Sequence, residues 1–228
     1  MFIIPKPQEM TFYDEILSFS GFDVKCDNEK IGSFFDKLND KKGTAAEVKK
    51  DGSLNGEQYK ITAKDNKITV LYGTDEGAYR AAATLKQIKA QAEDGMLNAF
   101  EIFDYPSIKN RGYMLDISRG KIPNSETIKN LVDILSDLKY NQLQLYMDSF
   151  VFEYKNFPEY VKDTEPLTAK EIKELEKYCK DRFVELVPNQ NGFGHMGSWM
   201  KKEELSHLAI TGKDGKPSQT LNPFLEGS

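Results

Sequence analysis

The sequence predicts a mixed α/β fold in which a small α/β unit precedes alternating strands and helices. Before residue 100, a hairpin pattern is followed by an alanine-rich helix pattern. After Asp104-Tyr105-Pro106, where proline disfavours a continuing helix, three strand patterns alternate with two helix patterns. A chain of 228 residues also exceeds what one compact domain usually needs. We therefore expect two domains, residues 1–105 and residues 106–228.

Local patterns identify the elements of the first expected domain. Residues 56–63 and 67–72 read as two strands, with Asp65 and Asn66 supplying the turn between them. Thr74 is a suitable N-cap for the helix that follows, and acidic residues in its first turn match the positive helix end. The small alanines of this helix allow it to lie close to a sheet.

The second expected domain alternates strand and helix. Its strands are expected at residues 113–117, 141–147 and 183–188. The first helix begins after Asn124 or Ser125, and the second follows a capping box between Thr168 and Glu171. Crossovers of one helix each imply parallel strands with right-handed connections.

Composition and charge exclude several classes of function. Thirty-one basic and 36 acidic residues give a net charge of −5, which argues against a nucleic-acid surface. No apolar run reaches the ~20 residues that span a bilayer, and no secretory signal begins the chain, so we expect no membrane partner. Cys26 and Cys179 are too few for a disulfide framework and favour a reduced, cytoplasmic location. With only two histidines and no P-loop lysine, we expect no metal and no cofactor.

Unusual polar residues follow each of the three parallel strands. Arg119 follows the first strand, Asp148 the second, and Asn191 and His195 the third. Parallel α/β folds bind ligands at the carboxyl ends of their strands, so these side chains are expected to face one cleft. There, Arg119 could bind hydroxyl groups, while an Asp148–His195 pair could orient or tune a proton donor.

Each of these residues also has a simple structural interpretation. Arg119 alone is equally consistent with a surface ion pair, and Asp148 with a cap after its strand. A lone histidine such as His195 is more often structural than catalytic, and Asn191 fits turn chemistry. Trp199 could stack on a sugar ring, although a lone tryptophan more often packs in the interior. The recurrence at three successive strand ends favours the functional interpretation.

Three segments, in this order, resemble glycoside hydrolase family 20: Arg111–Gly120 (RGYMLDISRG), Leu138–Tyr146 (LKYNQLQLY) and Glu185–Met196 (ELVPNQNGFGHM). The branch they resemble most contains the intracellular hexosaminidase-D-like β-N-acetylhexosaminidases. Thr220-Leu221-Asn222-Pro223 is similar to a segment of that branch, and Gly77–Ile88 resembles a helix of the family's accessory domain. The resemblance implies a small N-terminal α/β accessory domain followed by the first three β/α units of a truncated (β/α)₈ TIM barrel.

The resemblance also implies an activity. Such enzymes cleave terminal β-linked N-acetylglucosamine or N-acetylgalactosamine with retention, and the substrate's own acetamido oxygen attacks the anomeric carbon. An aspartate orients that acetamide, and the adjacent glutamate protonates the leaving oxygen. By position, Arg119 matches the arginine that holds sugar hydroxyls, and Asp148 and His195 match the pair supporting the general acid. Asn191, expected to bind substrate, stands where better-known members carry aspartate.

One departure from the family pattern bears on activity. The family's catalytic Asp-Glu pair ends the fourth barrel strand, and no Asp-Glu dipeptide follows His195; Glu203-Glu204 lies in an expected helix. Phe193 also replaces a proline, and Asp148-Ser149 lacks a double aspartate. We therefore expect a glycosidase fragment that is inactive alone, whose partner is an N-acetylhexosamine-containing glycan. The alternatives are a non-catalytic carbohydrate-binding or interaction module and self-association through exposed barrel edges.

Overall fold

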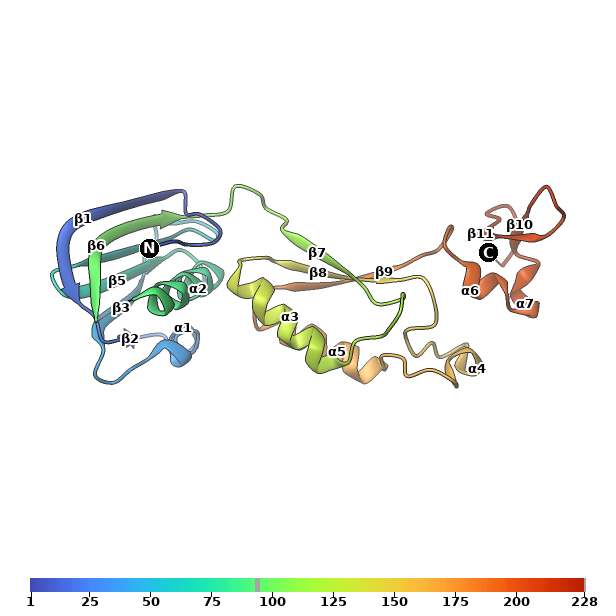
Figure 1. The fold of residues 1–228 in the computed structure, drawn as a ribbon, viewed down its shortest axis with the longest axis horizontal. Coiled ribbons are helices and arrows are strands. Elements are labelled where there is room, and N and C mark those ends of the chain that lie inside the picture. The colour runs from blue at the N-terminus through green and yellow to red at the C-terminus, as the bar shows by residue number, and fades with distance from the viewer. Residues whose placement is uncertain (93–94, 228) are drawn as a thin grey trace. The chain divides into compact units, whose positions relative to one another are not determined.

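The computed structural model describes residues 1–92 and 95–227, and the chain divides into two units (Figure 1). The first unit comprises Met1–Arg111 with Ile134–Tyr140, and the second comprises Gly112–Asp133 with Asn141–Ser228. Residues 93, 94 and 228, which fall inside the two predicted domains, lie outside the described residues.

The first unit contains a six-stranded sheet in the order β1-β6-β4-β5-β3-β2. Its strands are β1 (Glu9–Ser18), β2 (Phe22–Cys26), β3 (Thr44–Lys50), β4 (Tyr59–Lys64), β5 (Lys67–Tyr72) and β6 (Met96–Asp104). The predicted hairpin is confirmed, because β4 and β5 pair antiparallel around Asp65 and Asn66. Both turn residues have positive φ, 52° and 53°, which Asp and Asn tolerate better than most residues. β3, in contrast, pairs parallel with both β2 and β5.

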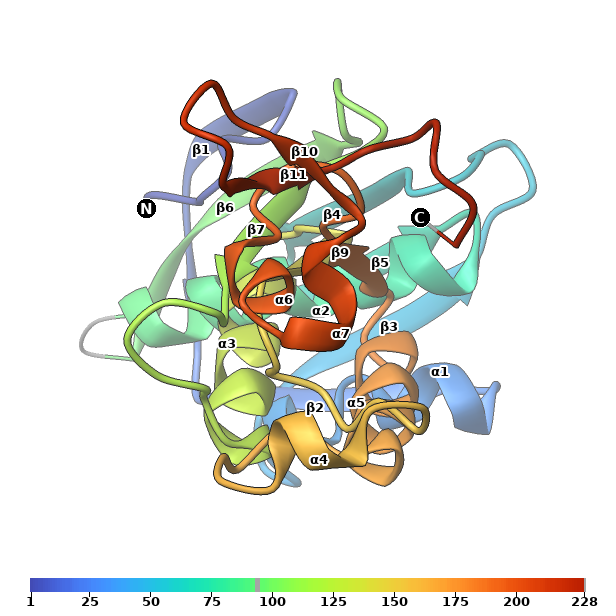
Figure 2. The ribbon, with the colours of Figure 1, turned by 90° about the vertical axis from the view of Figure 1, so that its right-hand side faces the viewer.

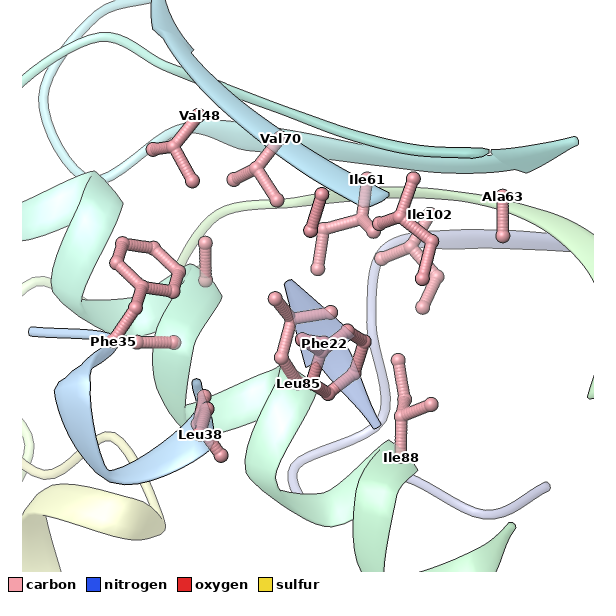
Figure 3. Packing of buried hydrophobic residues seen from close by; sticks show 14 of the residues in the cluster. Phe22, Phe35, Leu38, Val48, Ile61, Ala63, Val70, Leu85, Ile88 and Ile102 are labelled. Carbon is pink, nitrogen blue, oxygen red and sulfur yellow. The ribbon is translucent and has the colours of Figure 1, made fainter. Parts of the chain in front are cut away.

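Helices α1 (Glu29–Ser33) and α2 (Asp75–Gln91) and the short 3₁₀ helix η1 (Asp36–Leu38) also belong to the first unit. The predicted start of α2 is confirmed: Thr74 Oγ1 accepts the Gly77 N–H at 3.3 Å. Leu85 and Ile88 of α2 face the side chains of Ile61 and Ile102 from the sheet (Figure 3). All four side chains are fully buried. The apolar face of α2 and the inward-facing side chains of the strands therefore pack together in one core.

A sealed cluster of polar groups lies in the same unit, and we call Tyr59, Asp104 and Lys139 the buried cluster. Lys139 Nζ donates to Asp104 Oδ2 at 2.7 Å and to Tyr59 Oη at 2.8 Å. Tyr59 Oη donates to Asp104 Oδ2 at 2.7 Å and also lies 2.6 Å from Thr84 Oγ1. Burial lowers the pKa of Lys139 and raises that of Tyr59. Lys139 is the penultimate residue of the segment Ile134–Tyr140, which belongs to this unit. Its φ of 63° lies in the left-handed region.

The second unit contains a three-stranded parallel sheet in the order β7-β8-β9, as the sequence predicts. Its strands are β7 (Gly112–Asp116), β8 (Gln142–Met147) and β9 (Glu185–Gln190). Helix α5 (Ala169–Lys180) and the first residues of α3 (Ser125–Asp137) lie along one face of this sheet (Figure 1). On β8, Leu143, Leu145 and Met147 are buried, while the alternate residues Gln142, Gln144 and Tyr146 are half-buried on the other face.

The third parallel strand begins two residues later than predicted. Residues 183–188 are apolar enough to suggest a strand, but Phe183 has φ 54° and Val184 donates its N–H to the Cys179 carbonyl at 3.0 Å. The end of α5 therefore uses these residues for its closing turn. The predicted capping box is confirmed at the other end of α5, between Thr168 and Glu171.

The second unit has further elements, seen in Figure 2. Helix α4 (Pro158–Val161) lies between β8 and α5 in the chain. After β9 come α6 (Gly197–Met200), α7 (Glu203–Ser206) and the antiparallel pair β10 (Ala209–Thr211) and β11 (Pro217–Leu221). Trp199 of α6 is 7% exposed and contacts the rings of Phe150, Tyr154 and Phe157. Trp199 thus packs in the interior, the simpler of its two interpretations.

Candidate functional site

A cavity of about 480 Å³ in the second unit brings together three of the four predicted site residues. Arg119, Asp148 and His195 all line it. Each lies shortly after the last residue of its strand, because β7, β8 and β9 end at residues 116, 147 and 190. The rest of the wall comes from α6, its neighbour Lys201 and β11: Gly197, Ser198, Met200, Lys201, Pro217, Ser218 and Gln219.

Two carboxylates hold the Arg119 guanidinium. Nη1 donates to Asp116 Oδ2 at 2.6 Å, and Nη2 donates to Asp148 Oδ2 at 3.0 Å. A hydrogen bond to the Tyr146 hydroxyl and the charges of the two carboxylates raise the pKa of Arg119. The side chain nevertheless stays 59% exposed. A fixed cation with free surface suits the binding of hydroxyl or other acceptor groups.

Asn191, the fourth predicted residue, is connected to Arg119 through Tyr146. Asn191 Nδ2 donates to Tyr146 Oη at 2.8 Å, and Arg119 Nη2 donates to the same oxygen at 3.4 Å. The guanidinium carbon of Arg119 also lies 5.3 Å from the centroid of the Tyr146 ring. Asn191 is not among the residues that line the cavity.

Ser118 joins the ends of β7 and β8 beyond their last paired residues. Its backbone N–H donates to Asp116 Oδ1 at 2.8 Å, and its hydroxyl donates to the Tyr146 carbonyl at 3.3 Å. The Asp148 backbone N–H donates to Ser118 Oγ at 2.8 Å. The same carboxylate, Asp116, therefore orients both the Ser118 backbone and the Arg119 side chain.

His195 and Asp148 share the cavity, but within the described residues no hydrogen bond joins them. The Asp148 carboxylate accepts from Arg119 instead. His195 has φ 57°, in the left-handed region that is uncommon outside glycine, and such backbone strain is often found at functional sites. The proposed pairing of His195 with Asp148 stays a prediction.

Sequence patterns did not identify several residues of this site. Asp116 interrupts an apolar strand, which is a usable signal, and Tyr146 lies on the polar face of an alternating strand. Ser118 resembles any other loop serine in sequence. The sequence did not indicate that β11 forms part of the cavity wall, because residues 217–221 lack the apolar alternation typical of a strand.

In residues 1–92 and 95–227, no group of three or more His, Cys, Asp or Glu side chains could hold a metal ion. The helices described there are also too short or too polar to cross a membrane.

Family models match both parts of the chain. Residues 109–223 match the model of "Glycosyl hydrolase family 20, catalytic domain". Residues 21–105 match the model of "Glycosyl hydrolase family 20, domain 2".

Curated relatives match over part of their length. The chain is 29% identical over 154 residues to beta-hexosaminidase subunit alpha of Rattus norvegicus, and 27% identical over 162 residues to beta-hexosaminidase of Akkermansia muciniphila. Each match covers 63% of this chain, but only 29% and 33% of those proteins.

Solved structures share the fold over almost the whole chain. A family 20 exo-β-N-acetylglucosaminidase from Vibrio harveyi gives a TM-score of 0.76 at 20% identity, covering 99% of this chain and 42% of that chain. A β-N-acetylhexosaminidase from Bacteroides fragilis gives 0.71 at 23% identity, covering 91% and 48%. The predicted fold class is thus confirmed: an N-terminal α/β domain is followed by the first β/α units of a TIM barrel.

Proposed function

The chain belongs to glycosyl hydrolase family 20, and from that premise we propose that it provides the sugar-binding portion of a β-N-acetylhexosaminidase. The observation that carries the proposal is the convergence of Arg119, Asp148 and His195 on one cavity, each from a different parallel strand. This is the end of the sheet at which barrel enzymes bind substrate. The proposed ligand is a glycan with a terminal N-acetylhexosamine.

Each residue has a proposed role. Arg119, held by Asp116 and Asp148, donates to hydroxyls of the terminal sugar through its exposed surface. Asp148 and His195 support the proton donor of the complete enzyme. Asp148 Oδ2 accepts from Arg119, and we propose that the other carboxylate oxygen, Oδ1, gives this support.

Catalysis needs groups that this sequence does not contain after His195, namely the adjacent Asp and Glu of the family. The curated and solved relatives extend well beyond the region they share with this chain. We propose that the chain alone binds sugar without turning it over. Incubation with a nitrophenyl N-acetyl-β-glucosaminide is expected to release no nitrophenol above the buffer rate. Release that disappears in Asp148→Ala would refute this proposal.

Binding is tested directly by titrating the chain with N-acetylglucosamine, followed by nuclear magnetic resonance. We expect saturation in the millimolar range, because the chain covers only 42% and 48% of the two solved relatives and a small, exposed site pre-organises a sugar poorly. Arg119→Ala is expected to weaken binding about tenfold or more, since hydrogen bonds from a charged donor are lost. Arg119→Lys keeps the charge but not the planar fork, and should recover only part of the affinity. An unchanged affinity in Arg119→Ala would contradict the assignment.

The same titration distinguishes the second candidate function, a non-catalytic carbohydrate-binding module. The observation behind that candidate is the convergence of Arg119, Asp148 and His195 on a cavity whose described lining includes no glutamate. A module selected for binding would saturate at micromolar N-acetylglucosamine or a longer glycan. Millimolar saturation favours part of an enzyme.

A cytoplasmic location is part of the proposal. Its support is that both Cys26 and Cys179 are free thiols. Fractionation of cells producing the protein is the test, and recovery in a secreted or periplasmic fraction would count against it.

A further inference from the structure

The hydroxyl of Tyr146 has an unusual set of partners. Arg119 Nη2 and Asn191 Nδ2 both point at it, at 3.4 and 2.8 Å. A guanidinium and an amide nitrogen can only donate, so the Tyr146 oxygen accepts from both. A phenol has one proton to donate in addition to its acceptor sites. No acceptor for that proton is found among the described residues.

Tyr146 lies on the less buried face of β8. Leu145 and Met147, its neighbours along the strand, are buried, whereas Tyr146 alternates with them and is half-buried on the other face. Its register partners on the two neighbouring strands are Asp116 and Asn189. The free phenolic proton therefore faces the same side of the sheet as the carboxylate that holds Arg119.

We propose that Tyr146 is a further binding residue of the sugar site, donating its phenolic proton to a hydroxyl of the bound N-acetylhexosamine. The inference rests on the proposed function and adds a residue to it. Tyr146 is not among the residues that line the cavity, but its hydroxyl contacts Arg119, which does line it. Arg119 and Tyr146 form a pair of adjacent donors, one charged and one neutral. Two such donors match two neighbouring sugar hydroxyls, or both lone pairs of one.

Asn191 then has a defined role as a positioning residue. Its amide occupies one acceptor site of the Tyr146 oxygen, and Arg119 occupies the other. With both acceptor sites filled, the hydroxyl rotor is left to direct its proton outward. Asn191 thus acts on the ligand through Tyr146.

The test is a double-mutant cycle in which the Tyr146 hydroxyl is removed from the protein and one hydroxyl is removed from the ligand. Wild type and Tyr146→Phe are titrated with N-acetylglucosamine and with its 3-deoxy, 4-deoxy and 6-deoxy analogues, followed by nuclear magnetic resonance. We expect Tyr146→Phe to bind N-acetylglucosamine about three- to tenfold more weakly. For one deoxy analogue, the one lacking the contacted hydroxyl, wild type and variant should bind equally. Tyr113→Phe, on β7 and on the opposite face, is the matched control and should bind every ligand as wild type does.

Asn191→Ala gives a second, independent measurement. Asn191→Ala is expected to weaken the binding of N-acetylglucosamine less than Tyr146→Phe does. It should also reduce the difference in affinity between N-acetylglucosamine and the deoxy analogue that lacks the hydroxyl contacted by Tyr146. If Tyr146→Phe binds N-acetylglucosamine as tightly as wild type, the inference is wrong while the proposed function stands. If the variant loses equal affinity for every analogue, Tyr146 has only a structural role and the inference is again wrong. If wild type itself does not bind N-acetylglucosamine, the proposed function fails and the inference with it.

Discussion

The two units each contain a cation, a carboxylate and a tyrosyl hydroxyl in contact, but one group is sealed and the other is open. In the buried cluster, Lys139, Asp104 and Tyr59 are 5%, 6% and 1% exposed. The corresponding group of the second unit is Arg119, Asp148 and Tyr146, which we call the open cluster. The Arg119 side chain is 59% exposed, and the Asp148 side chain is 16% exposed.

The hydrogen bonds of the two tyrosines differ in the same way. Tyr59 Oη donates to Asp104, accepts from Lys139 and has Thr84 as a third partner. Tyr146 Oη accepts from two donors and keeps a proton for another partner. A sealed group must satisfy itself, because an unpaired polar atom in the interior is costly. An open group can leave a donor for a ligand, because water satisfies it meanwhile.

The largest expected effect is on the buried cluster. Lys139→Met leaves the Asp104 carboxylate buried without its cation, which should lower the free energy of unfolding by about 3–5 kcal/mol. The measurement is urea unfolding followed by circular dichroism. Lys86→Met is the matched control, because Lys86 pairs with Asp137 while 60% exposed, and it should cost less than about 1 kcal/mol.

A double variant separates the effect of the unpaired Asp104 charge from the effect of changed packing around residue 139. Adding Asp104→Asn to Lys139→Met removes the unpaired charge and should recover part of the lost stability. If Lys139→Met were no more destabilising than Lys86→Met, the contrast between sealed and open clusters would not hold.

The buried cluster also shows why only part of the fold could be predicted from the sequence. The hairpin, the N-cap of α2, the capping box of α5 and the parallel strands depend on neighbouring residues, and all were confirmed. Lys139, in contrast, looks like a solvated lysine beside a turn. Its partners Tyr59 and Asp104 are 80 and 35 residues away, and no periodicity encodes a contact of that range.

The candidate site was predictable to a similar extent. Strand ends of a parallel sheet converge by topology, so Arg119, Asp148 and His195 could be placed together from their positions alone. Their hydrogen-bond partners could not be predicted. The bond from Arg119 to Asp148 and the bond from the Asp148 N–H to the Ser118 hydroxyl both depend on side-chain rotamers, which the sequence pattern does not encode. The division into residues 1–105 and 106–228 stays a proposal; in the structure, Ile134–Tyr140 belongs to the first unit.

An intermediate effect is expected for Ser118, which orients the open cluster without belonging to it. Ser118→Ala removes the acceptor of the Asp148 N–H, which should cost about 1 kcal/mol of stability. Because Ser118 no longer links the segment that carries Arg119 to the segment that carries Asp148, N-acetylglucosamine should also bind about threefold more weakly. Both quantities are measured by urea unfolding and by magnetic resonance titration.

Two further variants separate these contributions. Ser118→Thr keeps the hydroxyl and should restore binding. Ser206→Ala removes an exposed hydroxyl that donates to the Glu203 carbonyl at 2.9 Å, and it should change neither quantity. A Ser118→Ala variant that loses stability but binds normally would confine Ser118 to a structural role.

The smallest expected effect comes from Glu47, a carboxylate whose two lysine partners have exposed side chains. Glu47 on β3 contacts Lys49 and Lys67, whose hydrogen bonds lower the pKa of Glu47 to about 2. Because the folded-state pKa lies below the unfolded value of 4.5, the contribution of Glu47 to stability is present above pH 4.5 and is lost as the pH falls toward 2. Solvent screens this pair, so the contribution should be well below that of the buried cluster.

The measurement compares wild type with Glu47→Gln by urea unfolding at pH 7, 4.5 and 2.5. Other carboxylates with lowered pKa, including Asp51 and Glu171, titrate in both proteins, so only the difference between the two reports on Glu47. That difference should be small at pH 7 and should shrink further at pH 2.5, which lies below the unfolded pKa of 4.5 and close to the folded pKa of about 2. If the difference grew on acidification, the attraction of Lys49 and Lys67 would not be what stabilises the charged form. If Glu47→Gln lowered the free energy of unfolding at pH 7 as much as Lys139→Met does, exposure would not be the property that separates the sealed from the open ion pairs of this molecule.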